Sequence, residues 1–215
     1  VSSQGAIAEG EGVPIITFDS YRSSPSLNTG GSGDAVLVWS DDRNICNEFE
    51  DESACNANDG CAWDSGNENC NTVYEHGEDL YAQRISVEDN TINTQWGYGG
   101  KLICNAESDQ TSPRVAPFSG DKTIMTWEDQ RDDDTDVYFQ ILDENGDSDL
   151  SINGVPACIG EGQIIKPRVK AEDSIAFIVW EDQRDGNSDI YAQKINSDGS
   201  TLWNDNGLAI STAME

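Results

Sequence analysis

The chain has 215 residues, 36% of them hydrophobic, which is enough to bury a sizeable core in one β domain or a repeat array. Its 41 acidic and 12 basic side chains give a formal charge of −29, which argues against nucleic acid or an anionic membrane as a partner. No apolar run reaches the roughly 18 residues of a membrane helix, so membrane insertion is not predicted.

Residues 1–16 are predicted to form a strand segment that belongs to no complete repeat. Gly5 to Ile16 aligns with Gly154 to Ile165, which contains the last strand of a repeat further along the chain. A surplus strand of this kind can add to the open sheet edge of a neighbouring copy. We therefore predict head-to-tail assembly through seven residues of this segment: Gly5, Ala6, Ile7, Ala8, Val13, Ile15 and Ile16.

Three repeats follow, at residues 17–105, 106–160 and 161–215. Each contains Trp-x-Asp-x-Arg followed by Asp-x-Tyr-x-Gln, and Trp127 and Trp180 are 53 residues apart, close to the period of propeller blades. The β-branched and aromatic run before each Trp predicts a buried strand, and the Asp-x-Tyr segment predicts its hairpin partner. No segment of ten or more residues has a helical period, so we predict an all-β fold of three propeller-like, four-stranded blades.

The repeated residues are predicted to be structural, because a residue needed in every repeat normally serves the fold of every repeat. Asp and Arg beside a hairpin, with Asp, Tyr and Gln across it, can satisfy buried backbone groups and one another. The alternative is a carbohydrate platform, in which Trp and Tyr stack on sugars while Asp and Arg bind hydroxyls. These residues are Trp39, Asp41, Arg43, Asp79, Tyr81, Gln83, Trp127, Asp129, Arg131, Asp136, Tyr138, Gln140, Trp180, Asp182, Arg184, Asp189, Tyr191 and Gln193.

Repeat one carries an insertion of about 31 residues within 44–76, which holds four of the six cysteines. Cys46, Cys55, Cys61 and Cys70 lie in a segment rich in Asn, Asp, Glu and Gly that cannot bury enough apolar surface to fold unaided. We predict that two disulfides hold this loop, in any of three pairings. A zinc site is the weaker alternative, because no CxxC pair or nearby His supplies the usual ligands.

The compartment is predicted from the same cysteines. Disulfides persist in oxidising environments, so we expect an extracellular or cell-surface protein. The chain starts at Val1 without an initiator Met or a leader, which is typical of a secreted product after signal-peptide removal and also of a fragment.

The last two cysteines, Cys104 and Cys158, occupy equivalent places in the fourth strands of repeats one and two. A bond between them would leave no free thiol in an exported protein, so we predict this pairing. The limit on it is geometric, because a disulfide allows a Cα separation of only about 7 Å.

One turn, at residues 143–149, has the composition of a calcium loop. Its oxygen-bearing side chains alternate around a glycine, at Asp143, Asn145, Asp147 and Asp149. The order differs from that of an EF-hand, in which the glycine follows the third ligand and a distant Glu closes the site. Calcium is thus the one candidate cofactor, and a solvated acidic hairpin is the alternative.

The segment from Trp180 to Arg184, a Gly/Asn turn and the segment from Asp189 to Gln193 resemble the blade repeat of secreted bacterial β-propeller-like proteins. The resemblance covers nearly the whole chain outside the insertion. It implies an exported propeller-like fold and no particular chemistry, because one fold hosts many functions. Three repeats are fewer than the typical 4–8 blades of a closed propeller.

Enzymatic interpretations find little support in these residues. The single histidine, His76, cannot supply a repeated Ser-His-Asp or Cys-His arrangement, and 41 acidic residues make any glycosidase carboxylate pair uninformative. We therefore predict a non-enzymatic extracellular structural protein that self-associates head to tail, by strand addition, into a filament or surface assembly. The alternatives are a lectin-like carbohydrate-binding adhesion module and, third, a glycosidase-like propeller fragment. The expected partners are other copies of the chain or glycans.

Overall fold

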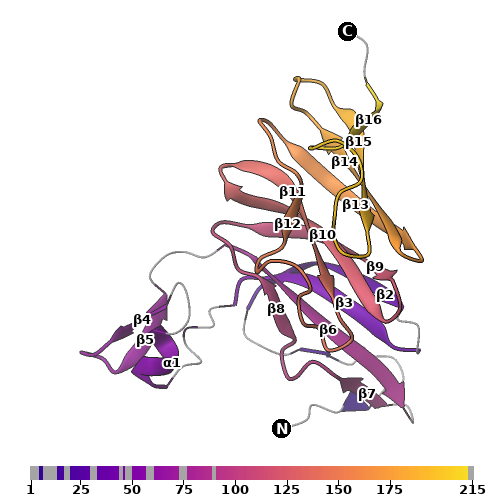
Figure 1. The fold of residues 1–215 in the computed structure, drawn as a ribbon. Coiled ribbons are helices and arrows are strands. Elements are labelled where there is room, and N and C mark those ends of the chain that lie inside the picture. The colour runs from indigo at the N-terminus through magenta and orange to yellow at the C-terminus, as the bar shows by residue number, and fades with distance from the viewer. Residues whose placement is uncertain are drawn as a thin grey trace.

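The computed structural model describes residues 5–6, 14–16, 20–29, 33–43, 46, 50–56, 61–72, 77–88 and 91–212. Within these residues the chain is nearly all β, and three main sheets follow one another along the sequence (Figure 1). The prediction of an all-β fold is confirmed. No helix in the described part of the chain is long and apolar enough to cross a membrane.

Sheet one contains the strands of the first repeat together with β1 of the N-terminal segment, in the order β1-β7-β6-β3-β2, and β8 also pairs with β6. Trp39 on β3 lies opposite Tyr81 on β6, so the two halves of the first motif are cross-strand neighbours. The strands are β1 (Gly5–Ala6), β2 (Arg22–Thr29), β3 (Ala35–Asp41), β6 (Asp79–Glu88), β7 (Thr91–Thr94) and β8 (Lys101–Cys104).

Sheets two and three are four-stranded and antiparallel, with strands in chain order. Trp127 lies opposite Tyr138, and Trp180 lies opposite Tyr191, which repeats the register of sheet one. Sheet two consists of β9 (Gln110–Phe118), β10 (Lys122–Asp132), β11 (Asp134–Leu142) and β12 (Val155–Cys158). Sheet three consists of β13 (Ile164–Glu172), β14 (Ile175–Asp182), β15 (Asp189–Asn196) and β16 (Leu208–Ser211).

The three sheets stack through two apolar cores. The first strands of neighbouring sheets, β2, β9 and β13, lie side by side. Val38 and Leu80 of sheet one pack with Trp127 of sheet two, and Phe139 of sheet two packs in a second core with Trp180 of sheet three. Burial of these side chains holds the stack together, at roughly 25 cal/mol per Å² of apolar surface removed from water.

The insertion lies to one side of the three sheets (Figure 1). It contains α1 (Glu52–Asn56) and a hairpin of β4 (Cys61–Asp64) and β5 (Asn69–Thr72). Its buried core consists of cysteines, with the half-buried Trp63 packed against them. The main sheets are therefore built without it.

The N-terminal strand has a partner within its own sheet. In β1, Gly5 lies opposite Ile92 and Ala6 lies opposite Thr91 of β7. This strand is hydrogen-bonded inside its own chain, at the edge of sheet one, whereas the prediction expected it to be surplus.

The other residues assigned to assembly divide into two groups. Ile15 and Ile16 line an apolar hollow on sheet one together with Leu37 and Trp39, so they cover their own sheet. Ile7, Ala8 and Val13 lie outside the described residues.

A glycine precedes the fourth strand of each sheet and lies against the Trp of the same sheet. A Cβ on Gly100 would lie 2.7 Å from Trp39 Cη2, and a Cβ on Gly207 would lie 2.5 Å from Trp180 Cη2. Gly154 contacts Trp127 in the same way and has a φ of +77°. The Trp ring therefore requires a residue without a side chain at this point.

The substitution Gly154→Ala is expected to destabilise the chain strongly, because it adds both a clash with Trp127 and an unfavourable positive φ. Gly120→Ala is the matched control, since Gly120 has a φ of +73° and no atom within 4 Å of an added Cβ. The control is expected to cost about 1–2 kcal/mol in the free energy of unfolding. Urea denaturation should show a clearly larger loss for Gly154→Ala; equal losses would show that the Trp contact does not matter.

Candidate functional site

A buried Asp in each sheet accepts hydrogen bonds from the Trp and the Arg of its motif. In sheet one, Trp39 Nε1 donates to Asp41 Oδ2 at 3.0 Å, and Arg43 Nε donates to the same oxygen at 2.9 Å. The corresponding bonds in sheets two and three are 2.8 and 3.0 Å long from Trp, and 2.8 and 2.7 Å from Arg Nε. Asp41, Asp129 and Asp182 are at most 1% exposed.

The same Arg lies over the Tyr ring of the neighbouring strand. Its guanidinium carbon is 3.8 Å from the ring centroid of Tyr81, 3.9 Å from that of Tyr138 and 4.4 Å from that of Tyr191. Each Arg also donates to a backbone carbonyl in the loop before the fourth strand, at Gly99, Asn153 or Asn206. The cluster thus joins the two motif strands to the fourth strand by charge-assisted and cation–π contacts.

Two of these carboxylates, those of Asp41 and Asp182, are held in their ionised form. Burial by itself raises the pKa of Asp41 and Asp182, but hydrogen bonds from Arg43 and Arg184, together with those from Trp, outweigh it. The pKa of each of these two carboxyls is therefore lower than usual. Their oxygens are engaged by groups of the same sheet.

The Gln of each motif ties its strand to the following loop. Gln83 Oε1 accepts from the Trp96 amide at 2.8 Å, and Gln83 Nε2 donates to the Gly97 carbonyl at 2.6 Å. Gln140 and Gln193 make the equivalent bonds to residues 150–151 and 203–204. The three motif Trp rings are buried, so they are not exposed for stacking on a sugar. The geometry favours the structural interpretation of the repeated residues over the carbohydrate platform.

The first Asp of Asp-x-Tyr-x-Gln has different surroundings in sheets one and two. Asp136 Oδ1 accepts from the Gly160 amide at 3.0 Å, whereas the buried Asp79 Oδ1 has no hydrogen-bond partner among the described residues. Burial, and then the charge of Asp41, raise the pKa of Asp79 to about 7, while Arg43 opposes the shift. Asp79 is only 5% exposed, which closes this carboxyl to an external substrate.

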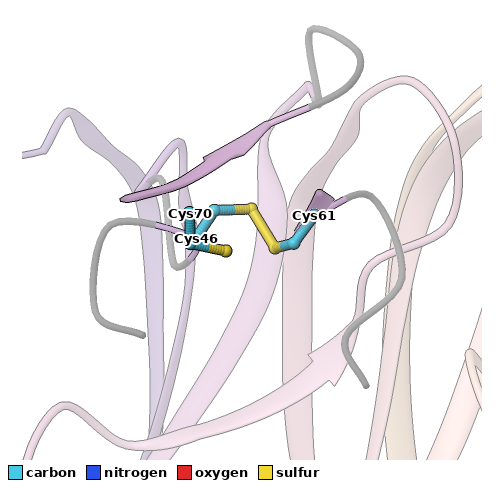
Figure 2. Close-up of side chains that lie close together, drawn as sticks. All are labelled: Cys46, Cys61 and Cys70. Carbon is cyan, nitrogen blue, oxygen red and sulfur yellow. A yellow bond between two sulfur atoms is a disulfide. The ribbon is translucent and has the colours of Figure 1, made fainter. Parts of the chain in front are cut away.

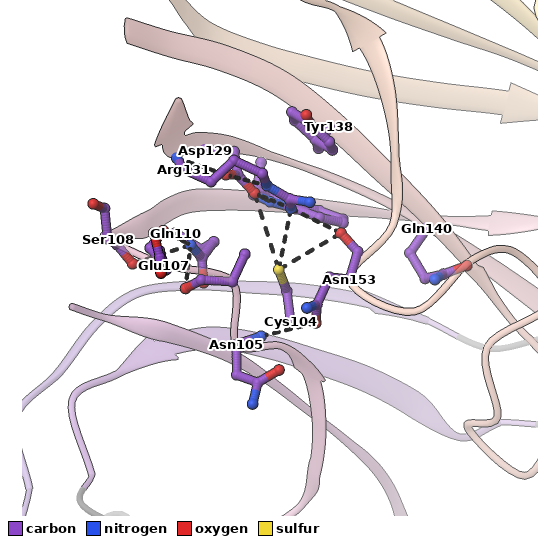
Figure 3. Close-up of polar contacts among 12 residues, drawn as sticks. Cys104, Asn105, Glu107, Ser108, Gln110, Asp129, Arg131, Tyr138, Gln140 and Asn153 are labelled. Carbon is purple, nitrogen blue, oxygen red and sulfur yellow. Dashed lines mark hydrogen bonds and ion pairs between the residues drawn. The ribbon is translucent and has the colours of Figure 1, made fainter. Parts of the chain in front are cut away.

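Cys104 and Cys158 are free and buried, so the predicted bond between them is wrong. Cys104 Sγ lies 3.4 Å from Arg131 Nη2 and 3.6 Å from the Asn153 carbonyl, both in sheet two (Figure 3). Cys158 makes the equivalent contacts with sheet three. The two thiols therefore fill successive interfaces between sheets instead of facing each other. Burial raises the pKa of both to about 12, which keeps them neutral.

The insertion is held by two disulfides, Cys46–Cys61 and Cys55–Cys70, with Cα separations of 5.5 and 5.7 Å. The sulfurs of Cys46, Cys61 and Cys70 lie within 4.8 Å of one another (Figure 2). All three are disulfide-bonded and have no thiolate to offer, so this group does not hold zinc.

The residues assigned to calcium have other partners. Asp143 Oδ1 accepts from the amides of Asn145 and Asp147, at 2.9 and 2.8 Å, and so closes the turn. Two of the carboxylates form ion pairs with lysines: Asp147 with Lys101 at 2.5 Å and Asp149 with Lys122 at 2.7 Å. These contacts give the turn the hydrogen bonds and ion pairs of an acidic hairpin, and calcium binding at these residues stays a prediction.

A different surface has the features of a binding site. It is the face of sheet three turned away from sheet two, called here the outer face. A row crosses three strands of this face, because Phe177 on β14 pairs with Lys170 on β13 and with Lys194 on β15. Phe177 is 41% exposed, and its ring centroid lies 5.8 Å from that of the half-buried Trp203. Exposed apolar side chains surround the row at Val179, Ile190 and Leu208.

The corresponding row of sheet two is aliphatic. Ile124 pairs with Ala116 and with Ile141, and all three are buried in the core shared with sheet three. Trp203 likewise stands where sheet two has Leu150 and sheet one has the buried Trp96, since the amides of all three residues donate to the Gln of their motif. Sheet three therefore has aromatic and cationic side chains where sheet two has packing residues. The repeat alignment contains this signal, but an interpretation based on what the repeats share overlooks it.

Comparisons with known proteins add information about the fold. No family model matches the chain, and no curated protein matches its sequence. A GH43_1 enzyme from Xanthomonas citri is similar in structure, with a TM-score of 0.51 at 14% identity. The same enzyme complexed with xylose gives a TM-score of 0.51 at 13% identity, and its xylotriose complex gives 0.50 at 13%. Each match covers 92% of this chain and 57% of the enzyme, so the chain spans little more than half of that protein's length.

This similarity supports a propeller-like fold. It also overturns the prediction of a structural protein that assembles head to tail into a filament, because the proteins of similar structure are glycoside hydrolases. The pairing of β1 with β7 also gives Gly5 and Ala6, part of the predicted donor segment, a partner within their own chain.

Replacing Arg184 with Gln is expected to lower the free energy of unfolding by about 3–5 kcal/mol, because it leaves the buried carboxylate of Asp182 without its cation. Lys122→Gln breaks an ion pair whose side chains are 38% and 35% exposed, and is expected to cost at most about 1 kcal/mol. Thermal or urea denaturation of both variants measures the difference. Similar losses would contradict a structural role for the Arg184 cluster.

The pKa of Asp79 predicts a stability that falls as the pH rises. The folded chain retains the Asp79 proton up to about pH 7, whereas the unfolded chain loses it near 3.8, so this contribution is largest below pH 4 and is lost through pH 7. Asp79→Asn mimics the protonated carboxyl and should be more stable than the parent at pH 8, by on the order of 3 kcal/mol. Asp189→Asn, at the equivalent position of sheet three, is the control. A parent and an Asp79→Asn variant with the same pH profile would contradict the assignment.

Proposed function

We propose that the chain is a carbohydrate-binding module and that its site is the outer face of sheet three. The contact between the exposed ring of Phe177 and the half-buried ring of Trp203 is the observation that carries the proposal. Aromatic rings offer a large apolar surface at a small entropic cost, and a sugar ring presents an apolar face that stacks on them. In this proposal the three main sheets are three propeller blades, and the disulfide-linked insertion is an appendage of the first blade.

The sugars bound by the structurally similar enzyme support this ligand class. The Xanthomonas citri protein was crystallised with xylose and with xylotriose. At 13% identity the two proteins share a fold and not a site. The sugar specificity of this chain is therefore proposed from the side chains of its own outer face. The disulfides of the insertion support an extracellular location, where glycans are accessible.

The module is proposed to bind sugars without hydrolysing them. Glycoside hydrolysis needs two carboxyl groups on either side of an accessible bond. Asp79, the carboxyl with a pKa of about 7, is buried in sheet one, and the motif carboxylates are bound to Arg. Binding through a sheet face is the function that the exposed groups support best.

Phe177→Ala and Trp203→Ala are each expected to weaken glycan binding about tenfold, or ~1.4 kcal/mol. Calorimetric titration with xylo-oligosaccharides and galacturonate oligosaccharides measures the affinities, and a reducing-sugar assay should detect no release. Tyr98→Ala removes a ring that is 51% exposed elsewhere and should leave binding unchanged. Binding that survives both aromatic substitutions, or no binding to any sugar of the panel, contradicts the proposed function.

A further inference from the structure

We infer that the outer face of sheet three selects acidic polysaccharides, whose uronate carboxylates bind Lys170 and Lys194 while their sugar rings stack on Phe177 and Trp203. This inference rests on the proposed function and adds the class of sugar. Three observations support it: the two lysines lie on either side of Phe177, the aliphatic row of sheet two is replaced in sheet three, and the rings of Phe177 and Trp203 lie together on this face.

Cations are scarce in this chain, and most of them are neutralised. It has 12 basic side chains against 41 acidic ones, and eight of the 12 form ion pairs. The other four have no ion-pair partner among the described residues: Arg114, Arg168, Lys170 and Lys194. Two of these four flank Phe177 in one row, and Arg168 pairs with Val179 in the next row of the same sheet. Three of the four basic residues without an ion-pair partner among the described residues therefore lie on sheet three.

Sheet one has a cation at the corresponding position of its own row, and sheet two covers it. Arg84 stands at the position of Lys194, opposite the buried Val36. Its Nε lies 3.0 Å from Asp34 Oδ2, so the chain supplies the carboxylate itself. Sheet three supplies none for Lys170 or Lys194 among the described residues, and the outer face is therefore complementary to a ligand that brings its own negative charge.

A sugar fits this face better than a further protein sheet does. Where sheet two receives another sheet, its row is Ala116, Ile124 and Ile141. Covering Lys170 and Lys194 with a sheet of that kind would bury two charges without partners, which is costly. A polysaccharide leaves both lysines partly in water while its rings cover the aromatic pair.

The geometry also favours a carboxylate on the sugar ring. Lys170 and Lys194 lie two strands apart, which is about 10 Å between backbones, with Phe177 between them. Lys194 Nζ lies 5.9 Å from the Phe177 ring centroid. A uronate carries its charge at the edge of the ring, so it can reach a lysine while the apolar ring face stays on the aromatic side chain.

The formal charge of −29 opposes a polyanion at long range but not at this site. At a physiological ionic strength near 0.15 M the Debye length is about 8 Å, so more distant carboxylates are largely screened. The two lysines act within that distance of a bound sugar.

The test compares a galacturonate tetrasaccharide with xylotetraose at about 0.15 M NaCl, by calorimetric titration of the full chain. The parent is expected to bind the galacturonate at least about tenfold more tightly. In the double variant Lys170→Gln/Lys194→Gln this preference should disappear, while the remaining aromatic-dependent affinity becomes similar for the two sugars. Lys101→Gln/Lys122→Gln removes the same charge from two ion-paired lysines and should keep the preference.

The outcomes separate this inference from the proposed function. If the chain binds xylotetraose through Phe177 and Trp203 without preferring galacturonate, the acidic class is wrong and carbohydrate binding stands. If neither sugar binds, both ideas fail. Sedimentation velocity gives the remaining outcome: a parent that self-associates and becomes monomeric on Phe177→Asp uses the outer face as a protein interface, which overturns the inference. Circular dichroism and melting temperature confirm that each variant is folded.

Discussion

The buried Asp of each motif is the group on which the rest of the structure depends. A carboxylate with almost no exposed surface is tolerated only when it is paired and hydrogen-bonded. Asp129 meets this condition through Trp127 on its own strand and through Arg131. Arg131 in turn reaches the Asn153 carbonyl, in the loop that delivers the fourth strand. One ionic group thus fixes the Trp ring, the Arg side chain and the loop that carries Gly154, and each sheet repeats the arrangement.

The strand pairing of the main sheets could be predicted from the sequence because its determinants are local. A β-branched run that ends in Trp, a short turn and Asp-x-Tyr define a hairpin without reference to distant residues. In the structure this pairing sets Trp39 against Tyr81 and Trp180 against Tyr191. The all-β fold follows from the same patterns, since they leave no segment with a helical period.

Relations between sheets could not be predicted in the same way. Cys104 and Cys158 are equivalent in the repeats, and equivalence places them in successive interfaces, each against the Arg of the next sheet. The N-terminal segment resembles a fourth strand in sequence, which indicates a strand but not its partner. In the structure β1 pairs with β7, an additional strand that the repeat pattern does not include. In both cases the sequence indicates that the segment is a strand. Which residues or strands it contacts depends on how the sheets are arranged in space.

The candidate site cannot be predicted from the residues that the three repeats share. Residues shared by all three repeats are occupied with the fold: their carboxylates are bound to Arg, their Trp rings are buried and their Gln side chains bind loop amides. A ligand binds to exposed groups that have no partner within the protein. The residues repeated in every sheet are not such groups. Sheet three has Lys170, Phe177 and Lys194 in a row whose counterpart in sheet two only packs. Sheet one also has a cation in this row, at Arg84, but its own Asp34 pairs with it. The lysines of sheet three have no such partner among the described residues, and this difference is the basis of the proposed ligand.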